Sequence, residues 1–277
     1  MNQPKLARDG LGVEQFSLTG DVALVTGATG HLGSQMAEAL ASAGAHVLIN
    51  SRCRQAAVDL AKALCIRGFK ASTAVFDLTD PTATEAGVAE LGNQFGRLDI
   101  LINNANAGRP ASIAETSPSD FIDAFEIGVN APFFLVKRLL PMLTAAAPRR
   151  PGGASIVNIS SMYGTVSPDP SIYGSSGQNS AAHYGAAKGA LNQLSRYLAV
   201  HLASRGIRVN TLSPGPFPGA AARHNAPDFV ARLAGKVPMG RVGEAREICG
   251  PVLFLAAPAS AYVTGAHLAV DGGWTAW

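Results

Sequence analysis

Charged residues are scarce in this sequence of 277 residues. Asp, Glu, Lys and Arg together make up 15% of it, whereas an ordinary globular domain carries about 25%. Apolar residues make up 47%, and this balance excludes intrinsic disorder, which requires low hydrophobicity and high net charge. The formal net charge is only +3. We therefore expect no nucleic-acid partner, because proteins that bind nucleic acids present a concentrated basic face.

No basic cluster stands out except the pair Arg149-Arg150, within the turn-forming segment Pro148–Gly153. A pair of this kind in a surface turn is typical of solvated charges. We do not interpret it as a binding patch.

Cysteine and long apolar runs are also nearly absent. The cysteines Cys53, Cys65 and Cys249 are scattered without metal-ligand spacing, which favours ordinary packing in a reducing compartment and no metal site. No run of about 20 apolar residues predicts a membrane span, and residues 1–16 lack the apolar stretch of a secretory signal. We expect a soluble, cytoplasmic protein with a flexible arm at 1–16 and a single domain at 17–277.

Strand-like and helix-like segments alternate from residue 21 onward. The predicted strands are short and mostly apolar, and they lie at Val22–Thr26, His46–Asn50, Ala71–Phe76, Leu98–Asn103, Ser155–Ile159, Arg208–Leu212 and Leu268–Val270. Segments with helical spacing lie at Leu32–Ala43, Gln55–Ile66, Thr82–Phe95, Ser119–Thr144 and Tyr184–Ser204. This alternation predicts an α/β protein with a Rossmann-type, doubly wound parallel sheet of seven strands and helices on both faces.

Two segments, Ser161–His183 and Pro214–Asn225, break this alternation and lack helical spacing. Each follows a predicted strand, so both leave the carboxyl edge of the sheet, where open α/β sheets bind their ligands. Long irregular loops inside compact domains are usually functional or disordered. We therefore expect the ligand site near these two segments.

A glycine-rich loop, Thr26–Gly33, joins the first predicted strand to the first predicted helix. Gly27, Gly30 and Gly33 allow a tight turn that brings backbone N–H groups close to a pyrophosphate at the helix N-terminus. An ordinary strand-to-helix turn also uses glycine, but the place of this loop in a βαβ unit favours a dinucleotide site. Thr29 and His31, in the same loop, complete its predicted cofactor contacts.

The end of the second predicted strand distinguishes NAD from NADP. A carboxylate there accepts the ribose hydroxyls of NAD, whereas a basic residue accommodates the 2′-phosphate of NADP. The sequence has Ser51 and Arg52 at this point and no acidic residue before Asp59. Arg52 could also be an ordinary surface arginine, but its guanidinium would gain a charge-assisted contact from a phosphate. NADP(H) is therefore the preferred cofactor and NAD(H) the alternative.

Tyr184 and Lys188 lie four residues apart at the start of a predicted helix and so share one face. A free tyrosine has a pKa of about 10, and a neighbouring cation lowers it. Ser161 ends a predicted strand upstream, and Asn130 lies on an apolar helix face where a buried amide needs a partner. Taken singly, these residues also fit a surface helix, a turn serine and a core asparagine.

Together these motifs resemble the short-chain dehydrogenase/reductase family, in its compact single-domain branch. The resemblance extends from about Leu18 to Trp277 and rests on motifs in the family's order: the glycine loop, Asp77, Asn103-Asn104-Ala105, Asn130, Ser161, Tyr184 with Lys188, Pro214-Gly215 and Val270-Asp271-Gly272-Gly273. Within the family, the chain is similar to gluconate 5-dehydrogenase and 3-oxoacyl reductase-like members.

The resemblance implies a role for each matching residue. Tyr184 would be the general acid and base, Lys188 would lower its pKa and bind the nicotinamide ribose, and Ser161, with Ser160 as the alternative, would polarise the substrate carbonyl. Asn130 would hold a water that links Lys188 to solvent. The other implied cofactor contacts are Asp77 and Leu78 at the adenine, Asn104 and Ala105 at the adenosine ribose, and Pro214 and Gly215 at the nicotinamide.

Two departures from the family pattern stand out. His31 occupies the position of the loop's usual middle glycine. Tyr184 follows Ser161 by 23 residues, a longer spacing than the family's, which we interpret as an insertion within Pro168–Asn179. Its polar residues are Asp169, Ser171, Tyr173, Ser175, Ser176, Gln178 and Asn179. They suit a hydroxylated substrate; the alternative is a loop that only covers the site or packs at a subunit interface.

We therefore predict an NAD(P)-dependent oxidoreductase that transfers a hydride between NADP(H) and a secondary alcohol or ketone, with a polyhydroxylated substrate in view of the insertion. The resemblance also implies a homotetramer or homodimer, with Trp274 and Trp277 against a neighbouring subunit. Two other classes are weighed against the enzyme. A non-catalytic NADP-sensing regulator on the same fold would lack the Tyr184/Lys188 pair, and a structural scaffold would not need the glycine loop.

Overall fold

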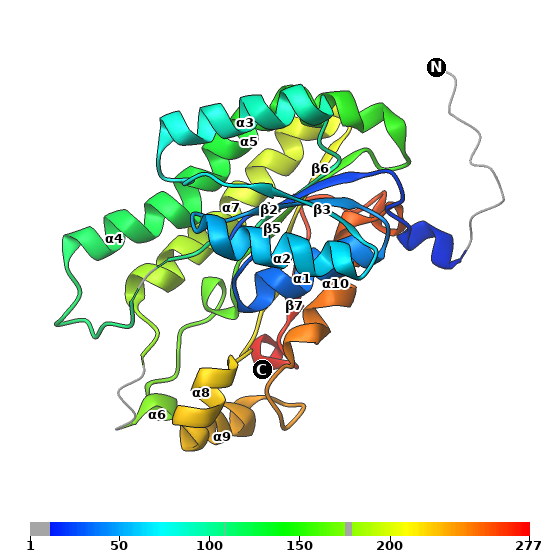
Figure 1. Ribbon diagram of the computed structural model, residues 1–277. Helices are drawn as coiled ribbons and strands as arrows, with labels where there is room; N and C mark the ends of the chain where they lie inside the picture. The colour runs from blue at the N-terminus through cyan, green and yellow to red at the C-terminus, as the bar shows by residue number, and fades with distance from the viewer. Residues whose placement is uncertain (1–11, 108, 175–178) are drawn as a thin grey trace.

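A parallel β-sheet forms the centre of the molecule in the computed structural model, which describes residues 12–107, 109–174 and 179–277 (Figure 1). Its strands are β1 (Val22–Val25), β2 (His46–Asn50), β3 (Lys70–Ala74), β4 (Ile100–Asn103), β5 (Ala154–Ile159), β6 (Ile207–Pro214) and β7 (His267–Val270). They are hydrogen-bonded in the order β3-β2-β1-β4-β5-β6-β7, and every neighbouring pair is parallel. The predicted doubly wound, seven-stranded fold is confirmed.

Helices cover both faces of the sheet (Figure 1). On one face lie α1 (His31–Ser42), α2 (Arg54–Ile66) and α10 (Cys249–Ala256); on the other lie α3 (Pro81–Phe95), α5 (Ala131–Ala146) and α7 (Ala182–Leu202). Helix α4 (Pro118–Phe125) packs against α7, and the short helices α6 (Pro170–Tyr173), α8 (Ala220–Asn225) and α9 (Pro227–Lys236) gather beyond the sheet. None of the helices in the described residues combines the length and the apolar character that a membrane span requires.

The hydrophobic core is divided by the sheet into two layers. In β1, Ala23 and Val25 pack into the layer beneath α1, α2 and α10, whereas Val22 and Leu24 pack into the layer beneath α3, α5 and α7. Successive side chains of a strand point to opposite faces. Because both faces are covered, every residue of this strand is buried, which explains its uninterrupted apolar sequence.

The single helix predicted at Ser119–Thr144 is wrong, because the structure divides it. Helix α4 begins after Ser117, whose hydroxyl caps it, and ends at Phe125. A π-turn, Glu126–Asn130, then precedes α5. A β-carbon placed at Gly128 would lie 3.3 Å from the side chain of Ala187 in α7. Glycine at this point therefore allows the π-turn to approach α7 closely.

The two segments predicted as irregular contain short helices. Helix α6 begins at Pro170, and the Asp169 carboxylate accepts the Ser171 N–H to cap it. Four residues are too few to establish helical spacing in a sequence. Residues 1–11 lie outside the described part of the chain, and Val13–Phe16 forms a 3₁₀ turn.

A third, smaller core lies under α9. Its buried members are Met162, Ile172, Leu233, Val237, Val242 and Trp274. The expectation that Trp274 packs against a neighbouring subunit is therefore wrong, because its ring is buried inside its own chain, edge-on to Tyr163. Trp277 is exposed.

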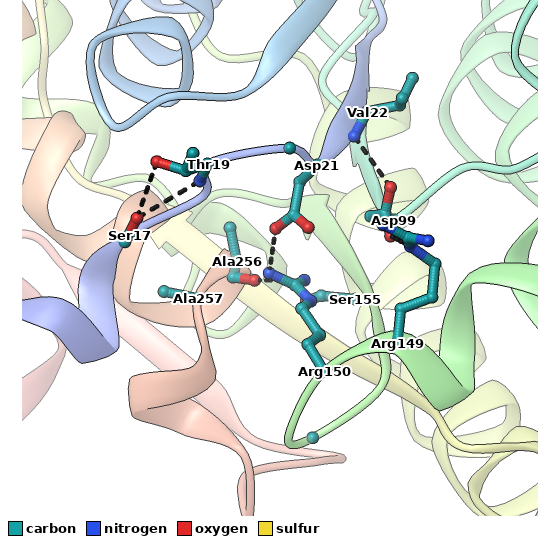
Figure 2. A network of polar contacts seen from close by, with 12 residues as sticks. Ser17, Thr19, Asp21, Val22, Asp99, Arg149, Arg150, Ser155, Ala256 and Ala257 are labelled. Atoms are coloured by element: carbon teal, nitrogen blue, oxygen red, sulfur yellow. Dashed lines mark hydrogen bonds and ion pairs between the residues drawn. The ribbon is translucent and has the colours of Figure 1, made fainter. Parts of the chain in front are cut away.

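The amino edge of the sheet carries a network of charged residues (Figure 2). Arg150 donates to the Asp21 carboxylate at 2.6 Å and to the Ala256 carbonyl oxygen at 2.8 Å. Nearby, Asp99 accepts the Val22 N–H at 2.8 Å. The side chain of Arg150 is 9% exposed, so the interpretation of Arg149-Arg150 as two solvated charges is wrong for Arg150. Burial raises the pKa of Asp21 to about 6, although Arg150 opposes the effect.

Candidate active site

A cavity of about 1120 Å³ opens at the carboxyl edge of the sheet. It lies where β1 pairs with both β2 and β4, the point at which chain connections diverge to the two sides and at which doubly wound folds bind their ligands. All predicted site residues except Asn130 line it: Gly27, Thr29, Gly30, His31, Gly33, Ser51, Arg52, Asp77, Leu78, Asn104, Ala105, Ser161, Tyr184, Lys188, Pro214 and Gly215.

The glycine loop is held against the end of β4 and leaves no room for side chains. Gly27 has a positive φ of 59°, and a β-carbon there would lie 2.9 Å from the Cα of Ala105. A β-carbon at Gly33 would collide with the Gly27 carbonyl oxygen. The Asn104 side-chain amide donates to the carbonyl oxygens of Thr26 and Gly27 at 2.9 and 3.1 Å. The loop is thus a bare backbone cradle before a helix N-terminus, which fits a pyrophosphate.

His31 replaces the family's middle glycine without strain. It is the first residue of α1, and no described residue other than glycine has a positive φ. A β-carbon at Gly219, the residue before α8, would lie 3.8 Å from the His31 ring. His31 therefore lies between the glycine loop and the segment that leads into α8.

The end of β2 presents an exposed guanidinium that is only loosely paired with a carboxylate. The Arg52 side chain is 73% exposed, and its Nη1 is 3.8 Å from Asp77 Oδ2, beyond hydrogen-bonding distance. Burial raises the pKa of Asp77, but hydrogen bonds from Thr79 and the charge of Arg52 outweigh it, so this pKa is lowered and Asp77 is ionised at neutral pH. The hydroxyls of Thr29 and Ser51 lie 3.2 Å apart beside them. This edge suits a ribose phosphate next to Arg52.

Tyr184 and Lys188 project into the cavity from the first turns of α7. Lys188 is buried, its ammonium donates to the Ile159 carbonyl oxygen at 2.9 Å, and it lies 5.7 Å from the centre of the Tyr184 ring. Burial lowers the pKa of Lys188 to about 8. Burial also raises the pKa of Tyr184, while a hydrogen bond with Ser161 lowers it. Burial dominates in this structure, so the pKa of Tyr184 lies above its usual value, and the role implied for Lys188 stays a prediction.

The two serines that end β5 differ in what their hydroxyls do. Ser160 donates its proton to the Lys188 carbonyl oxygen at 3.0 Å. Ser161 accepts the Tyr163 N–H at 3.2 Å, so its own proton is free for Tyr184 or for a ligand. This geometry favours Ser161 over Ser160 as the residue that contacts a substrate oxygen.

Asn130 is the predicted site residue that the structure places elsewhere. Its side chain is exposed, whereas a buried amide was expected, and it donates to Glu126 Oε2 at 2.8 Å. The cavity wall at this point is formed by Asp123, Glu126 and Ile127, which the sequence-based prediction missed. Their spacing places them on one face of a helix, and that spacing is the signal that could have found them. Phe217, after β6, also lines the cavity and was missed.

The polar residues of the insertion do not line the cavity where they are described. Asp169 forms an ion pair with Lys236 of α9 at 2.6 Å, Tyr173 is buried, and Asn179 donates to the Ala111 carbonyl oxygen at 2.6 Å. Ser175, Ser176 and Gln178 lie outside the described residues. The described part of the insertion thus packs against neighbouring elements. Among all the residues that the structure describes, no group of three or more His, Cys, Asp and Glu residues could hold a metal ion.

Comparison with protein families and sequences places this cavity in a known context. A family model described as enoyl-(acyl carrier protein) reductase matches residues 27–275. Gluconate 5-dehydrogenase of Gluconobacter oxydans is 37% identical over 262 residues, which cover 94% of this chain and 96% of that protein. The rhamnolipids biosynthesis 3-oxoacyl-[acyl-carrier-protein] reductase of Pseudomonas aeruginosa is 34% identical, with coverage of 93% and 97%.

Solved structures match the fold over nearly its whole length. The Pseudomonas aeruginosa RhlG/NADP active-site complex superimposes with a TM-score of 0.85 and 34% identity, covering 94% of this chain and 98% of that one. A gluconate 5-dehydrogenase from Burkholderia cenocepacia in complex with NADP and tartrate also gives a TM-score of 0.85, with 32% identity and coverage of 96% and 99%.

Proposed function

Because this chain belongs to the short-chain dehydrogenase/reductase family, we propose that its cavity binds NADP(H) and that Tyr184 exchanges a proton with the oxygen of a ketone or secondary alcohol. The chain is an oxidoreductase that acts on CH–OH groups with NAD(P). One observation supports the finer proposal most strongly. Ser161, Tyr184 and Lys188 line one cavity with the glycine cradle, and Ser161 lies near enough to Tyr184 to oppose the rise of its pKa.

The residues present suit a nicotinamide dinucleotide with a 2′-phosphate. Gly27 and Gly33 provide the backbone cradle for the pyrophosphate, and the exposed guanidinium of Arg52 supplies a partner for the phosphate. Lys188 would bind the nicotinamide ribose, and Pro214 and Gly215 would flank the nicotinamide. When bound, this cofactor supplies or accepts the hydride.

The protein's own part in the reaction is the handling of one proton. In the reductive direction, Ser161 donates a hydrogen bond to the substrate carbonyl and stabilises the negative charge that develops on oxygen. The Tyr184 hydroxyl then gives its proton to that oxygen, which forms the O–H bond of the alcohol and leaves a phenolate near the Lys188 ammonium. In the oxidative direction the same proton moves from the alcohol to the phenolate.

The pKa shift at Tyr184 gives the proposed reaction a pH preference. Because burial raises this pKa, the phenol is protonated at neutral pH and is ready to act as an acid. The fraction of phenolate, which the oxidative direction requires, increases with pH. We therefore expect reduction at neutral pH and oxidation that increases as the pH rises.

A hydroxylated ketone is the substrate class that we propose. The support comes from relatives named gluconate 5-dehydrogenase and galactitol 2-dehydrogenase and from the polar side chains Asp123 and Glu126 in the cavity wall. We also propose a homotetramer or homodimer, supported by the exposed apolar side chains of Phe121, Ile122 and Phe134 on neighbouring helices, and measurable by light scattering.

The test separates binding from turnover. NADPH and NADH are titrated calorimetrically into the wild type and into Tyr184→Phe, and both proteins are then assayed at the nicotinamide absorbance with 5-keto-D-gluconate and ethyl acetoacetate. We expect tighter binding of NADPH than of NADH in both proteins, and reduction of the hydroxylated ketone by the wild type alone. If the wild type binds the cofactor but reduces neither ketone, the protein is instead the non-catalytic NADP-sensing regulator. If the wild type prefers ethyl acetoacetate, the proposed substrate class of hydroxylated ketones is wrong.

A further inference from the structure

The hydroxyl of Tyr173 forms a hydrogen-bonded pair with another tyrosine inside the protein. It is 3.0 Å from the hydroxyl of Tyr163, and the nearby Ser180, four residues before Tyr184, opposes the rise of its pKa. Tyr173 is 9% exposed. Burial raises the pKa of both tyrosines, so both hydroxyls stay neutral and can each donate and accept.

On one side, this chain of contacts reaches the proposed active site. Tyr163 follows Ser161 by two residues, and its backbone N–H donates to the Ser161 hydroxyl oxygen at 3.2 Å. Its ring packs edge-on against Trp274, which is buried in the third core. The side chain of Tyr163 is therefore fixed at both its ring and its hydroxyl. A fixed Tyr163 in turn fixes the N–H that orients the Ser161 hydroxyl.

On the other side, Tyr173 is attached to helix α9. Its ring stacks on Phe229, with ring centres 5.7 Å apart and planes 27° from parallel. Two further contacts join α9 to the same segment: Arg232 donates to the Ile172 carbonyl oxygen at 2.6 Å, and Lys236 pairs with Asp169 at 2.6 Å. Helix α8, which precedes α9, follows directly from the segment with Phe217 in the cavity wall.

We propose that Tyr173 is a positioning residue that couples helix α9 to the Ser161 hydroxyl through Tyr163. The described segment Asp169–Tyr173 thus acts as a strut between helix α9 and the proposed carbonyl-binding serine. In this role Tyr173 acts without touching the substrate. This inference rests on the proposed function for its catalytic consequence, and on the contacts above for the coupling itself.

Tyr173→Phe tests the strut because it keeps the stacked ring and removes only the hydroxyl. With 5-keto-D-gluconate and NADPH, we expect kcat to decrease about tenfold, the effect of losing one buried hydrogen bond, with the affinity for NADPH unchanged. Tyr163→Phe should give the same decrease, and the double variant no more than either alone. Tyr197→Phe on the exposed surface of α7 is the matched control and should keep wild-type kcat.

A double-mutant cycle distinguishes positioning from a general loss of structure. In a Ser161→Ala background, Tyr173→Phe should cause no further decrease in kcat, because the hydroxyl it positions is already gone. The same tenfold decrease in both backgrounds would overturn the proposal. An unchanged kcat in Tyr173→Phe alone would also overturn it.

Hydrogen exchange tests the coupling even where turnover is lacking. In Tyr173→Phe we expect faster exchange both in the segment that contains the Tyr163 amide and in α9, relative to Tyr197→Phe. Faster exchange in α6 alone would overturn the coupling. If the wild type itself fails to reduce any ketone but the two segments respond together, the strut stands and the proposed function fails.

Discussion

Lys188 carries a charge that its surroundings disfavour. Its ammonium is buried, and burial lowers its pKa from 10.5 to about 8. Below pH 8 the ammonium is charged in both the folded and the unfolded chain, so the full cost of burying it is present. As the pH rises from 8 to 10.5, the folded form releases its proton first and the cost declines.

We therefore expect Lys188→Met to abolish turnover and yet to stabilise the protein at pH 7, by at most roughly 3 kcal/mol. The gain should decrease as the pH approaches 10. Urea unfolding at several pH values measures it, with Lys137→Met on the exposed surface of α5 as the control that should show no such trend. A variant less stable than the wild type at pH 7 would contradict the expected burial cost.

Arg52 should determine the choice between the two nicotinamide cofactors. Its guanidinium is exposed at the cavity edge and is only weakly engaged by Asp77. Arg52→Ala should weaken NADPH binding by 10-fold or more, about the strength of one charge-assisted contact, and leave NADH binding nearly unchanged. Calorimetry measures both affinities, and Arg54→Ala, an exposed neighbour outside the cavity lining, provides the comparison. Equal losses of affinity for NADPH and NADH would contradict the proposed contact between Arg52 and the 2′-phosphate.

The convergence of single residues on one cavity was predictable where their position is set locally, and their environment was not predictable where it depends on distant packing. Arg52, Ser161, Tyr184 and Lys188 stand at the ends of strands or on one helix face, and all of them line one cavity. The raised pKa of Tyr184 could not be predicted, because it arises from burial by elements far away in the chain. The exposed position of Asn130 depends on the π-turn, which no spacing in the sequence indicates.

At the scale of an element, the loop between β1 and α1 should tolerate change at one glycine and not at another. A β-carbon at Gly33 would collide with the Gly27 carbonyl oxygen, whereas one at Gly30 would lie 3.3 Å from that oxygen. Gly33→Ala should therefore destabilise the fold by about 1–3 kcal/mol, as overpacking does, and abolish NADPH binding. Gly30→Ala should cause a much smaller loss of stability and of NADPH affinity. Thermal unfolding and calorimetry measure the difference; similar losses in the two variants would contradict the steric argument.

Whole elements were predictable to the extent that burial is regular. The strands lie within a few residues of their predicted bounds, because a sheet covered on both faces favours an unbroken apolar run, as in Val22–Val25. Helices α6 and α8 were missed because six residues or fewer carry no recognisable period. Helix α9 was missed although its apolar residues lie on one face, and that face is buried against Met162 and Trp274, which come from other parts of the chain.

For the molecule as a whole, Asp21 makes stability depend on pH at the edge opposite the cavity. Burial raises its pKa from 3.8 to about 6, so the folded chain binds this proton more tightly than the unfolded chain. The sign is therefore opposite to that of a typical salt-bridged carboxylate. The wild type should gain stability relative to Asp21→Asn as the pH falls from 7 to 4, by at most about 3 kcal/mol.

Urea unfolding of both proteins across this pH range measures the gain. Glu90→Gln, which changes an exposed carboxylate on α3, should follow the wild type in parallel. A wild type that loses stability relative to Asp21→Asn on acidification would show that Arg150 outweighs the cost of burial.

The third core also bears on the order in which the protein can assemble. Strands β1 to β4 and the glycine loop come from the first 104 residues of the chain, whereas the core under α9 joins Met162 and Ile172 to Trp274. Contacts between residues so far apart in sequence form slowly, because a long loop must close first. During synthesis, a nascent chain would therefore expose the apolar face of α9 until Trp274 emerged. In that interval the part of the chain that contains β1 to β4 and the glycine loop could already be folded. The exposed apolar face of α9 would then be a natural target for a chaperone.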